Sequence, residues 1–482
     1  MYTKISVAEK LPARGARQLA AIAIAAFTGV SAFGTASVQI DSDIAPMVSK
    51  SQVLAHVDLN MPISMVFVLP LEDPAGAESY AMRVNTPEDP LYKQYLTPEQ
   101  FGVRFGPSET DYNAVLTWAI STGLKPGETS RSRTTLSVRG TAAQCEALLN
   151  TSINNYRGPE GRLYYSAATT PSVPEAIARR VKSIVGLSSY NKFAPLVRVH
   201  KTRPGLPVLS AGGTGPLGAY SASDLRTAYQ IQPFAEVPKS GTVAIYEQGG
   251  FTANDIAVYE KQNRLSRVPV TVRNVNGFDG SVTDPTVELE AVLDIDMVIG
   301  INPAVKQVLV YEDGDDPFGV ALLDALADMA NDDSAQVISI SYGTDEAIQG
   351  TAQIAAEGLL FQQLAAQGQT VLVSSGDQGA YGRSGTGLKV SDPGAQPYVT
   401  SVGGTSLYTG PGGVYEVEEV WNLLGAGLGA TGGGVSSYWS IPSYQSRTLY
   451  PLPPPIFAAS APRAMRTPIS LVRRVTTYDM RP

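Results

Sequence analysis

The spacing of apolar positions divides the chain into two regions with different periods. Between about residues 50 and 190, short strand and helix patterns alternate on a small scale. The apolar run Met65–Leu71 predicts a buried strand. Thr97–Gln100 predicts a helix start, with a threonine cap, a proline in the first turn and a glutamine at the capping-box position. Thr141–Asn150 has the period of a helix. These elements indicate a small α+β domain.

Beyond about residue 219 the units become longer, and strands alternate with helices. We expect buried strands over six runs: Thr242–Tyr246, Val268–Val275, Val305–Tyr311, Gln336–Ser341, Val371–Ser375 and Tyr398–Val402. Helical patterns between these runs predict βαβ crossovers, which place helices on both faces of a mainly parallel sheet. The sequence therefore predicts an α/β domain.

Two further segments lack such periodicity. Residues 198–218 are rich in Pro, Gly and Ser, and this segment is either a surface loop or a linker that is cut during maturation. Near Ser446 the composition shifts toward proline and arginine, and no structure is predicted for 446–482. The expected division is a domain over 45–195, a linker over 196–218, a second domain over 219–445 and an unstructured tail.

The N-terminus has the pattern of an export signal. Four basic residues precede the apolar stretch Leu19–Phe33, and small residues at Gly34 and Ala36 form a small-x-small cleavage pattern. The alternative is a membrane anchor, but this stretch is short for roughly 30 Å of hydrocarbon. We therefore predict a signal peptide over residues 1–36 and a secreted protein.

Composition narrows the chemistry. The formal net charge of −8 argues against a nucleic-acid partner. Cys145 is the one cysteine of the chain, so an internal disulfide and a cysteine metal cluster are excluded. The two histidines are His56 and His200, so no residue after position 200 can supply an imidazole base.

Candidate catalytic groups are carboxyls. Glu290 and Asp294 are four residues apart in an apolar helical pattern, so their side chains lie on one helix face. A carboxyl pair on a buried helix is costly without partners, which favours a functional interpretation. Asp377 follows the apolar strand Val371–Val373, at the carboxyl end where open α/β sheets build their sites.

These residues belong to a larger set of segments that resembles the sedolisin family, the serine-carboxyl peptidases. The resemblance runs from about residue 50 to 445 and implies a subtilisin-like domain preceded by an α+β, ferredoxin-like prodomain of the pro-kumamolisin type. It is carried by seven segments in the family's order: Tyr92–Phe101, Arg104–Ser108, Glu290–Asp296, Ser339–Gly343, Ser374–Asp377, Pro397–Leu407 and Thr431–Ser436.

The resemblance implies a role for each candidate. In this family a Ser hydroxyl attacks the peptide carbonyl, and a carboxylate takes its proton in place of histidine. By motif, Glu290 is that base, Asp294 holds it in place, and Asp377 donates a hydrogen bond to the developing oxyanion. Carboxyls that share protons in this way point to activity in acid.

Two further sites follow less directly from the same resemblance. Glu247 aligns with an accessory acid of the carboxyl network, or it is a loop acid in water. Ser341, Tyr342 and Gly343 match the strand whose backbone pairs with the substrate. The family more often has Trp at the position of Tyr342, so the shape of the substrate pocket stays open.

The expected nucleophile is not found. The family's serine lies in Gly-Thr-Ser-Ala-x-x-Pro at a helix start, and no such motif occurs here. Ser406 lies in Gly404–Leu407, which belongs to another family segment and precedes a turn, so we do not expect it to be catalytic. The calcium site of the complete family domain is expected beyond the same point, so we expect no metal or cofactor in this chain. A frameshift or gene break near Ser446 is the simplest account, and resequencing the locus tests it.

The expected function is an exported, acid-acting serine-carboxyl endopeptidase zymogen that has no turnover as written. Its partners would be protein or peptide substrates and its own prodomain, with no nucleic acid and no membrane after signal removal. The alternative is a non-catalytic pseudopeptidase that binds peptides along Ser339–Gly343. A third interpretation, a general α/β domain with chance motifs, leaves seven matching segments unexplained.

Overall fold

The computed structural model describes two domains. The described residues are 36–44, 47–127, 129–190, 193–195, 213–215, 218–231, 238–282, 284–314, 319–382, 387–446 and 473–475. We call residues 36–190 the N-terminal domain and the described residues from 218 onward the C-terminal domain. The expected signal peptide and most of the expected linker lie outside the described residues. Within the described part of the chain, no helix has both the length and the apolar character needed to cross a membrane.

The N-terminal domain is built on a five-stranded sheet. Its strand order is β2 (Asp41–Ser42), β10 (Ser183–Val185), β4 (Pro62–Val68), β6 (Thr135–Thr141) and β5 (Lys125–Pro126). Helix α3 (Glu109–Ile120) connects β4 to β5, and α4 (Ala142–Leu149) connects β6 to β10. The four strands from β10 to β5 pair antiparallel, and this βαββαβ order is the ferredoxin-like one. The predicted α+β domain is thus confirmed.

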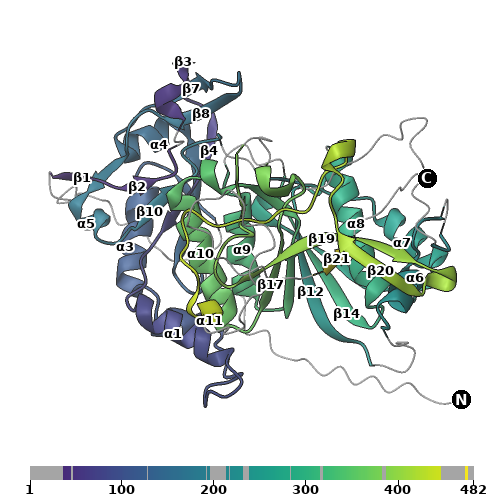
Figure 1. Ribbon diagram of the computed structural model, residues 1–482. Coiled ribbons are helices and arrows are strands. Elements are labelled where there is room, and N and C mark those ends of the chain that lie inside the picture. Colours follow the sequence, from purple (N-terminus) through teal and green to yellow (C-terminus); the bar gives the residue numbers. More distant parts are fainter. Residues whose placement is uncertain are drawn as a thin grey trace, which may run out of the picture.

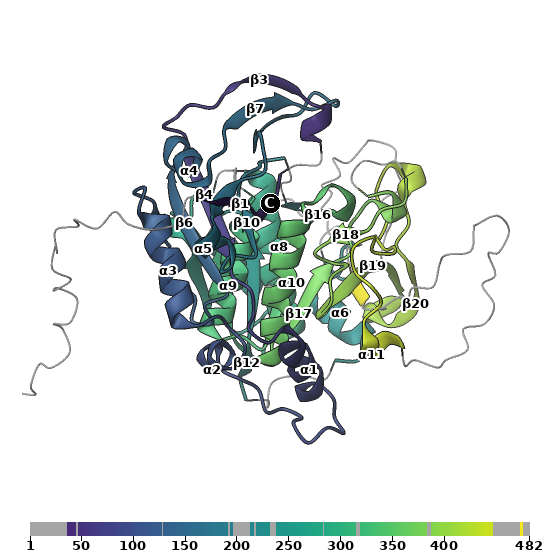
Figure 2. The same ribbon diagram turned by 90° about the vertical axis from the view of Figure 1, so that its left-hand side faces the viewer.

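Smaller elements complete this domain. Strands β3 (Gln52–His56), β7 (Ile153–Arg157) and β8 (Leu163–Ala167) form a separate antiparallel sheet, seen beyond α4 in Figures 1 and 2. Strands β1 (Ser37–Gln39) and β9 (Ser172–Pro174) pair with each other, and α5 (Glu175–Ala178) follows them.

Two more helices, α1 (Pro74–Val84) and α2 (Pro98–Arg104), lie toward the C-terminal domain. The predicted capping box at Thr97 and Gln100 is present at the start of α2.

The C-terminal domain is built on a mainly parallel sheet. Its order is β13 (Val270–Asn274), β14 (Val305–Glu312), β12 (Ser240–Glu247), β15 (Val337–Ile340), β17 (Thr370–Ser374), β19 (Val399–Thr409) and the antiparallel β20 (Tyr415–Val420). Strand β21 (Arg473–Val475) pairs parallel with β19. It lies in the segment 446–482, for which the sequence pattern predicted no structure. Three residues are too few to show a period of apolar positions, and this strand forms by pairing with β19.

Helices cover both faces of this sheet, as Figure 1 shows. Alternate residues of β12 point to opposite faces: Ala244 and Tyr246 pack with α9 (Ala321–Asp332) and α10 (Thr351–Ala366), and Ile245 packs with α7 (Ala253–Gln262) and α8 (Pro285–Ile301). A shorter helix, α6 (Ala222–Ala228), lies beside α8. The predicted α/β class with a mainly parallel, helix-covered sheet is confirmed.

The N-terminal domain packs against α9 and α10 (Figure 2). Apolar residues of both domains share one core, in which Phe101 of α2 and Phe361 of α10 are both fully buried. Backbone contacts fix the register of the interface, because the Leu96 N–H donates to the Ala366 carbonyl at 3.1 Å. The family-like segment around Tyr92–Phe101 therefore lies at the domain interface.

Candidate active site

Helix α8 carries the carboxyl pair that the sequence singled out. The Asp284 side chain caps its N-terminus by accepting from the Thr286 N–H at 2.7 Å, and Pro285 occupies the first turn. Glu290 and Asp294 are 2% and 4% exposed. One turn apart on a helix that packs against the sheet, they lie together in a site shielded from water.

Asp294 is held from the carboxyl edge of the sheet. The Ser341 hydroxyl donates to Asp294 Oδ2 at 2.5 Å, and this serine follows directly on β15. Because the carboxyl ends of parallel strands meet at one edge, a residue 47 positions away in sequence reaches the helix. The structure thus brings Ser341 to the predicted pair through its side chain, in addition to the backbone role expected from the sequence.

Glu247 joins this pair from the end of β12. It is fully buried, so the alternative in which it is a loop acid in water is wrong. Burial raises the pKa of Glu247 well above its ordinary value of 4.5, and the charges of Asp294 and Glu290 raise it further. We call Glu247, Glu290 and Asp294 the carboxyl cluster. Glu247 therefore lies without contact to water beside two other carboxyls, where its ionised form is unfavourable.

Tyr342 closes one side of the carboxyl cluster. Its hydroxyl donates to Glu247 Oε2 at 2.9 Å, and its ring contacts Tyr246 edge-on with centroids 5.4 Å apart. The side chain is fully buried, and burial together with Glu247 and Glu290 raises the pKa of its hydroxyl. The aromatic residue at this position therefore contacts the carboxyl cluster, and in this structure it does not line an open pocket.

Glu312, which the sequence pattern did not single out, belongs to the same edge. It ends β14, is 1% exposed and pairs in register with Glu247 on the neighbouring strand. Burial raises its pKa to about 7. The signal was present, because Glu312 follows an apolar strand in the way that Asp377 does, but only the adjacency of β12 and β14 gives it meaning.

The backbone of the expected substrate-binding segment is already paired. Tyr342 and Gly343 belong to β16 (Tyr342–Asp345), which lies between β11 (Ala194–Pro195) and β18 (Ser391–Asp392), both antiparallel to it. Ala194 pairs with Gly343 and Pro195 with Tyr342. An extended segment that follows the N-terminal domain thus occupies the edge of β16.

Asp377 lies at the same edge of the sheet, two strands from Glu247. It follows β17 and is half-buried, and its carbonyl accepts from the Ala430 N–H at 3.1 Å. Gly432 contacts the adjacent backbone, where a Cβ would lie 1.9 Å from the Ser375 carbonyl oxygen. Glycine is needed at 432 for this close approach, whereas nothing lies within 4 Å of a Cβ added at Gly433.

Ser406 does not have the position that a nucleophile of this family needs. It sits inside β19, opposite Glu419 of β20 in an antiparallel pair. No helix begins there to orient its hydroxyl, since the next element is a turn at Pro411–Gly413. In the described part of the chain, no group of three or more His, Cys, Asp or Glu side chains is arranged to hold a metal ion.

Comparison with known proteins places this chain in a family. Residues 49–190 match the family described as "Pro-kumamolisin, activation domain". The chain is 31% identical to sedolisin from Pseudomonas sp. (strain 101) over 449 residues, covering 88% of this chain and 75% of sedolisin. The chain belongs to the sedolisin family of serine-carboxyl peptidases.

Two other relatives agree with this assignment. Xanthomonalisin from Xanthomonas sp. (strain T-22) is 29% identical over 447 residues, which cover 83% of this chain and 53% of xanthomonalisin. Kumamolisin from Bacillus sp. (strain MN-32) is 29% identical over 368 residues, which cover 75% of this chain and 65% of kumamolisin. The predicted family resemblance is confirmed, and this sedolisin homologue spans between about half and three quarters of the relatives' lengths.

Proposed function

We propose that this sedolisin homologue is the zymogen form of an exported endopeptidase that acts in acid. The carboxyl cluster is the observation that carries the proposal. Glu290 is its general base, Asp294 orients that base, and Glu247 is the accessory acid behind them. Asp377 is the acid that donates to the oxyanion.

The chemistry requires partial protonation. Glu290 can accept a proton from a nucleophile only while it is ionised, whereas Asp377 can donate only while it is protonated. Both demands can be met in acid, where Glu247 with its raised pKa stays protonated beside Glu290 and does not add a further buried charge. An imidazole is not needed, which agrees with the two histidines lying upstream of this region.

The pairing of β11 with β16 supports the zymogen part of the proposal. A substrate would pair its backbone with β16, and Ala194 and Pro195 hold that edge after the N-terminal domain. Peptide substrates must displace this segment, so removal of the N-terminal domain would open the site. Export depends on residues 1–36, and a reporter fused behind them tests it by its appearance in the medium, cut after Ala36.

We further propose that a chain with this sequence has no turnover. It carries no Gly-Thr-Ser-Ala motif, and Ser406 lies inside a strand. Without a nucleophile, acyl transfer has no covalent route, and only a small rate from binding and oxyanion stabilisation would remain.

A second candidate function is peptide binding without cleavage. The pairing of an extended segment with β16 favours it, because this edge accepts a strand whether or not a nucleophile is present. The two candidates share one site, so the proposals differ only in turnover.

The test combines hydrolysis with binding. The purified chain is incubated with casein between about pH 3 and 5, beside an active sedolisin-family peptidase, and we expect neither casein cleavage nor release of the N-terminal domain. Detection of either product would overturn the proposed lack of turnover. Binding of a fluorescent peptide library is measured at about pH 4 on the wild type and on Ala194→Pro.

Proline at 194 removes the backbone N–H of the residue opposite Gly343 and disfavours a strand, so Ala194→Pro should weaken the β11–β16 pair and bind peptides more tightly than the wild type. The matched control, Ala194→Gly, keeps the N–H and should bind peptides as the wild type does. Equal affinity in all three chains would contradict a peptide site on β16.

A further inference from the structure

A second carboxyl pair lies away from the carboxyl cluster. Glu357 of α10 and Asp392 of β18 are both fully buried. Gln396 Nε2 bridges them, donating to Glu357 Oε2 at 2.6 Å and to Asp392 Oδ1 at 2.9 Å. Gln353 Nε2 donates to the other oxygen of Glu357 at 2.7 Å. The side-chain amides of Gln353 and Gln396 therefore contact the pair directly.

The charged groups around the Glu357–Asp392 pair are almost all acidic. From the turn after β16, the charge of Glu346 acts on Asp392, and Glu346 accepts from the Ser436 and Ser437 hydroxyls at 2.5 and 2.7 Å. The cation of this region, Lys389, pairs with Asp345 at 3.3 Å. From the N-terminal domain, Asp43 lies beyond Gln353. No Lys or Arg of the described residues forms an ion pair with Glu357 or Asp392.

Two adjacent carboxylates without a cation cannot both stay ionised in a site shielded from water. Burial, followed by the charge of Asp392, raises the pKa of Glu357 well above 4.5. Burial raises the pKa of Asp392 to about 6. The folded pair therefore holds a proton in acid. Its contribution to stability is complete below the ordinary carboxyl pKa and is lost as pH rises through the raised values.

The position of the pair links it to the peptide edge. Asp392 pairs with Thr344, so β18 supports β16 on the side opposite β11. Glu357 anchors the same point to α10, the helix that carries the domain interface.

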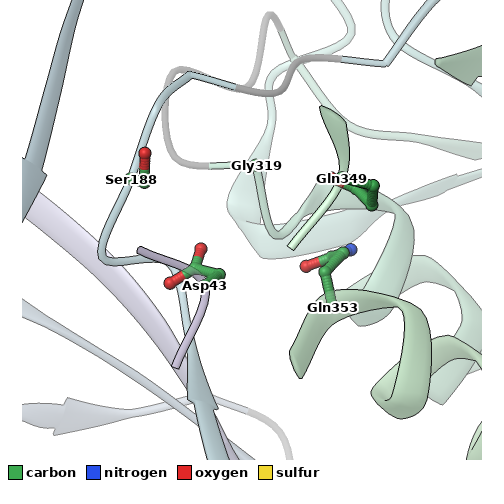
Figure 3. A pocket seen from close by; sticks show the side chains of 5 residues that line it. All are labelled: Asp43, Ser188, Gly319, Gln349 and Gln353. Carbon is green, nitrogen blue, oxygen red and sulfur yellow. The ribbon is translucent and has the colours of Figure 1, made fainter. Parts of the chain in front are cut away.

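Figure 3 shows Asp43 and Gln353 on opposite sides of a small pocket between the two domains, lined also by Ser188, Gly319 and Gln349. Asp43 accepts from the Gly186 and Leu187 N–H groups at 2.9 and 3.0 Å, and burial raises its pKa to about 7. The hydrogen-bonded side chains from Asp392 through Gln353 thus extend to the pocket that Asp43 of the N-terminal domain also lines. Asp43 has a raised pKa, so it responds to pH in the same direction as the pair.

We propose that the Glu357–Asp392 pair, while at least one of its carboxyls is protonated, is a pH-sensitive clamp that holds β18 and the peptide-binding strand β16 against α10. The peptide-binding role of β16 rests on the proposed function, whereas the clamp itself does not. In acid the clamp is closed and the edge of β16 is rigid. Toward neutral pH the second ionisation drives the two carboxylates apart, β18 loosens, and β16 loses its support without any change in the carboxyl cluster.

Hydrogen exchange of the full chain tests the clamp. Exchange of peptides covering 342–346 and 387–396 is followed by mass spectrometry at about pH 4 and 7.5, after correction for intrinsic exchange rates. We expect the hydrogen-exchange protection of the wild type to fall at least about tenfold at the higher pH, because the free energy of local opening is lower there. Glu357→Gln should keep its protection at both pH values, since a neutral amide of nearly the same shape replaces the protonated carboxyl.

Three further variants make the outcome specific. Asp392→Asn removes the other charge and should act like Glu357→Gln, and it replaces that variant if Glu357→Gln does not fold. Glu88→Gln, at an exposed turn, and Glu290→Gln, in the carboxyl cluster, should lose protection as the wild type does.

Protection that is independent of pH in the wild type, or lost equally in Glu357→Gln and Asp392→Asn, would overturn the clamp. This readout needs no catalysis. Casein cleavage would overturn the proposed lack of turnover and leave the clamp intact.

Discussion

The two domains differ most in where they place their carboxyl groups. Of the described carboxyls that are buried, one lies in the N-terminal domain, Asp43 at the interface. The others lie in the C-terminal domain: Asp224, Glu247, Glu260, Glu290, Asp294, Asp296, Glu312, Asp313, Asp324, Asp345, Glu346, Glu357 and Asp392. Carboxylates of the N-terminal domain instead pair with arginines near the surface, as Asp89 does with Arg83 at 2.9 Å.

This difference gives the domains opposite responses to pH. Raised pKa values, as in Glu247 and Glu357, stabilise the folded C-terminal domain in acid, and this stability is lost as pH rises through them. Lowered pKa values, as in Asp89 and Asp111, stabilise the N-terminal domain above their ordinary value of 3.8, and this stability is lost as pH falls. Acid would therefore weaken the surface ion pairs of the N-terminal domain, whereas Asp43 at the interface has a raised pKa and follows the C-terminal domain.

The largest effect that separates the domains should come from the N-terminal core. Phe67 is fully buried and contacts Trp118 edge-on at 5.5 Å between centroids, so Phe67→Ala should destabilise the N-terminal domain by about 3–5 kcal/mol. Urea unfolding is followed through Trp118 fluorescence in a background with Trp421 and Trp439 replaced by Phe. Phe67→Leu leaves a smaller cavity than Phe67→Ala and should cost clearly less. An unchanged Trp118 transition in Phe67→Ala would show that this core does not hold the domain together.

The next effect concerns the carboxyl cluster. Glu247→Gln keeps an acceptor for the Tyr342 hydroxyl and removes a buried charge beside Asp294 and Glu290. We expect little change at pH 4 and a gain of about 1–3 kcal/mol in unfolding free energy at pH 8, since the wild type must ionise buried groups there. Urea unfolding at both pH values measures it.

Glu416→Gln, on the exposed part of β20, is the control and should follow the wild type. If Glu247→Gln and the wild type have parallel pH profiles, Glu247 does not contribute to the acid preference of the C-terminal domain.

A smaller effect is expected at the cap of α2. Thr97→Ala removes the side-chain bond to the Gln100 N–H at 3.2 Å and should cost about 1 kcal/mol at pH 7. The Thr97 side chain also helps to lower the pKa of Glu99, so the cost should not grow at pH 4. Thr97→Ser keeps the hydroxyl and should recover most of the loss. A cost of Thr97→Ala that grows in acid would contradict the lowered pKa of Glu99.

The smallest effect is expected at a surface ion pair. Asp111 accepts from the Ser108 hydroxyl at 2.8 Å and from Arg180 Nε at 2.5 Å, and these bonds lower its pKa. Because the pair is partly exposed, Asp111→Asn should cost only about 0.2–1 kcal/mol at pH 7. The cost should vanish at about pH 2, where the wild-type carboxyl is protonated as well. Thermal unfolding across this range measures it, and a cost that grows in acid would reverse the sign assigned to the N-terminal domain.

Local pattern sufficed for the elements that carry the carboxyl cluster. The apolar period of α8 and the four-residue spacing placed Glu290 and Asp294 on one buried face, and the capping box at Thr97 appeared where the sequence indicated it. These features depend on neighbours within one helical turn, so the amino-acid order alone determined them. The alternation of strands and helices likewise determined the α/β class.

The contacts between distant segments were decided only by the tertiary structure. Glu357 lies in α10 and Asp392 in β18, which are distant in the sequence. Glu312 lies beside Glu247 because β12 and β14 are neighbouring strands, and β11 pairs with the distant strand β16. The local period of apolar positions does not indicate which strands become adjacent or which helix covers them. Burial and carboxyl pairing arise from that adjacency, and with them come the shared protons on which the chemistry and its pH dependence rest.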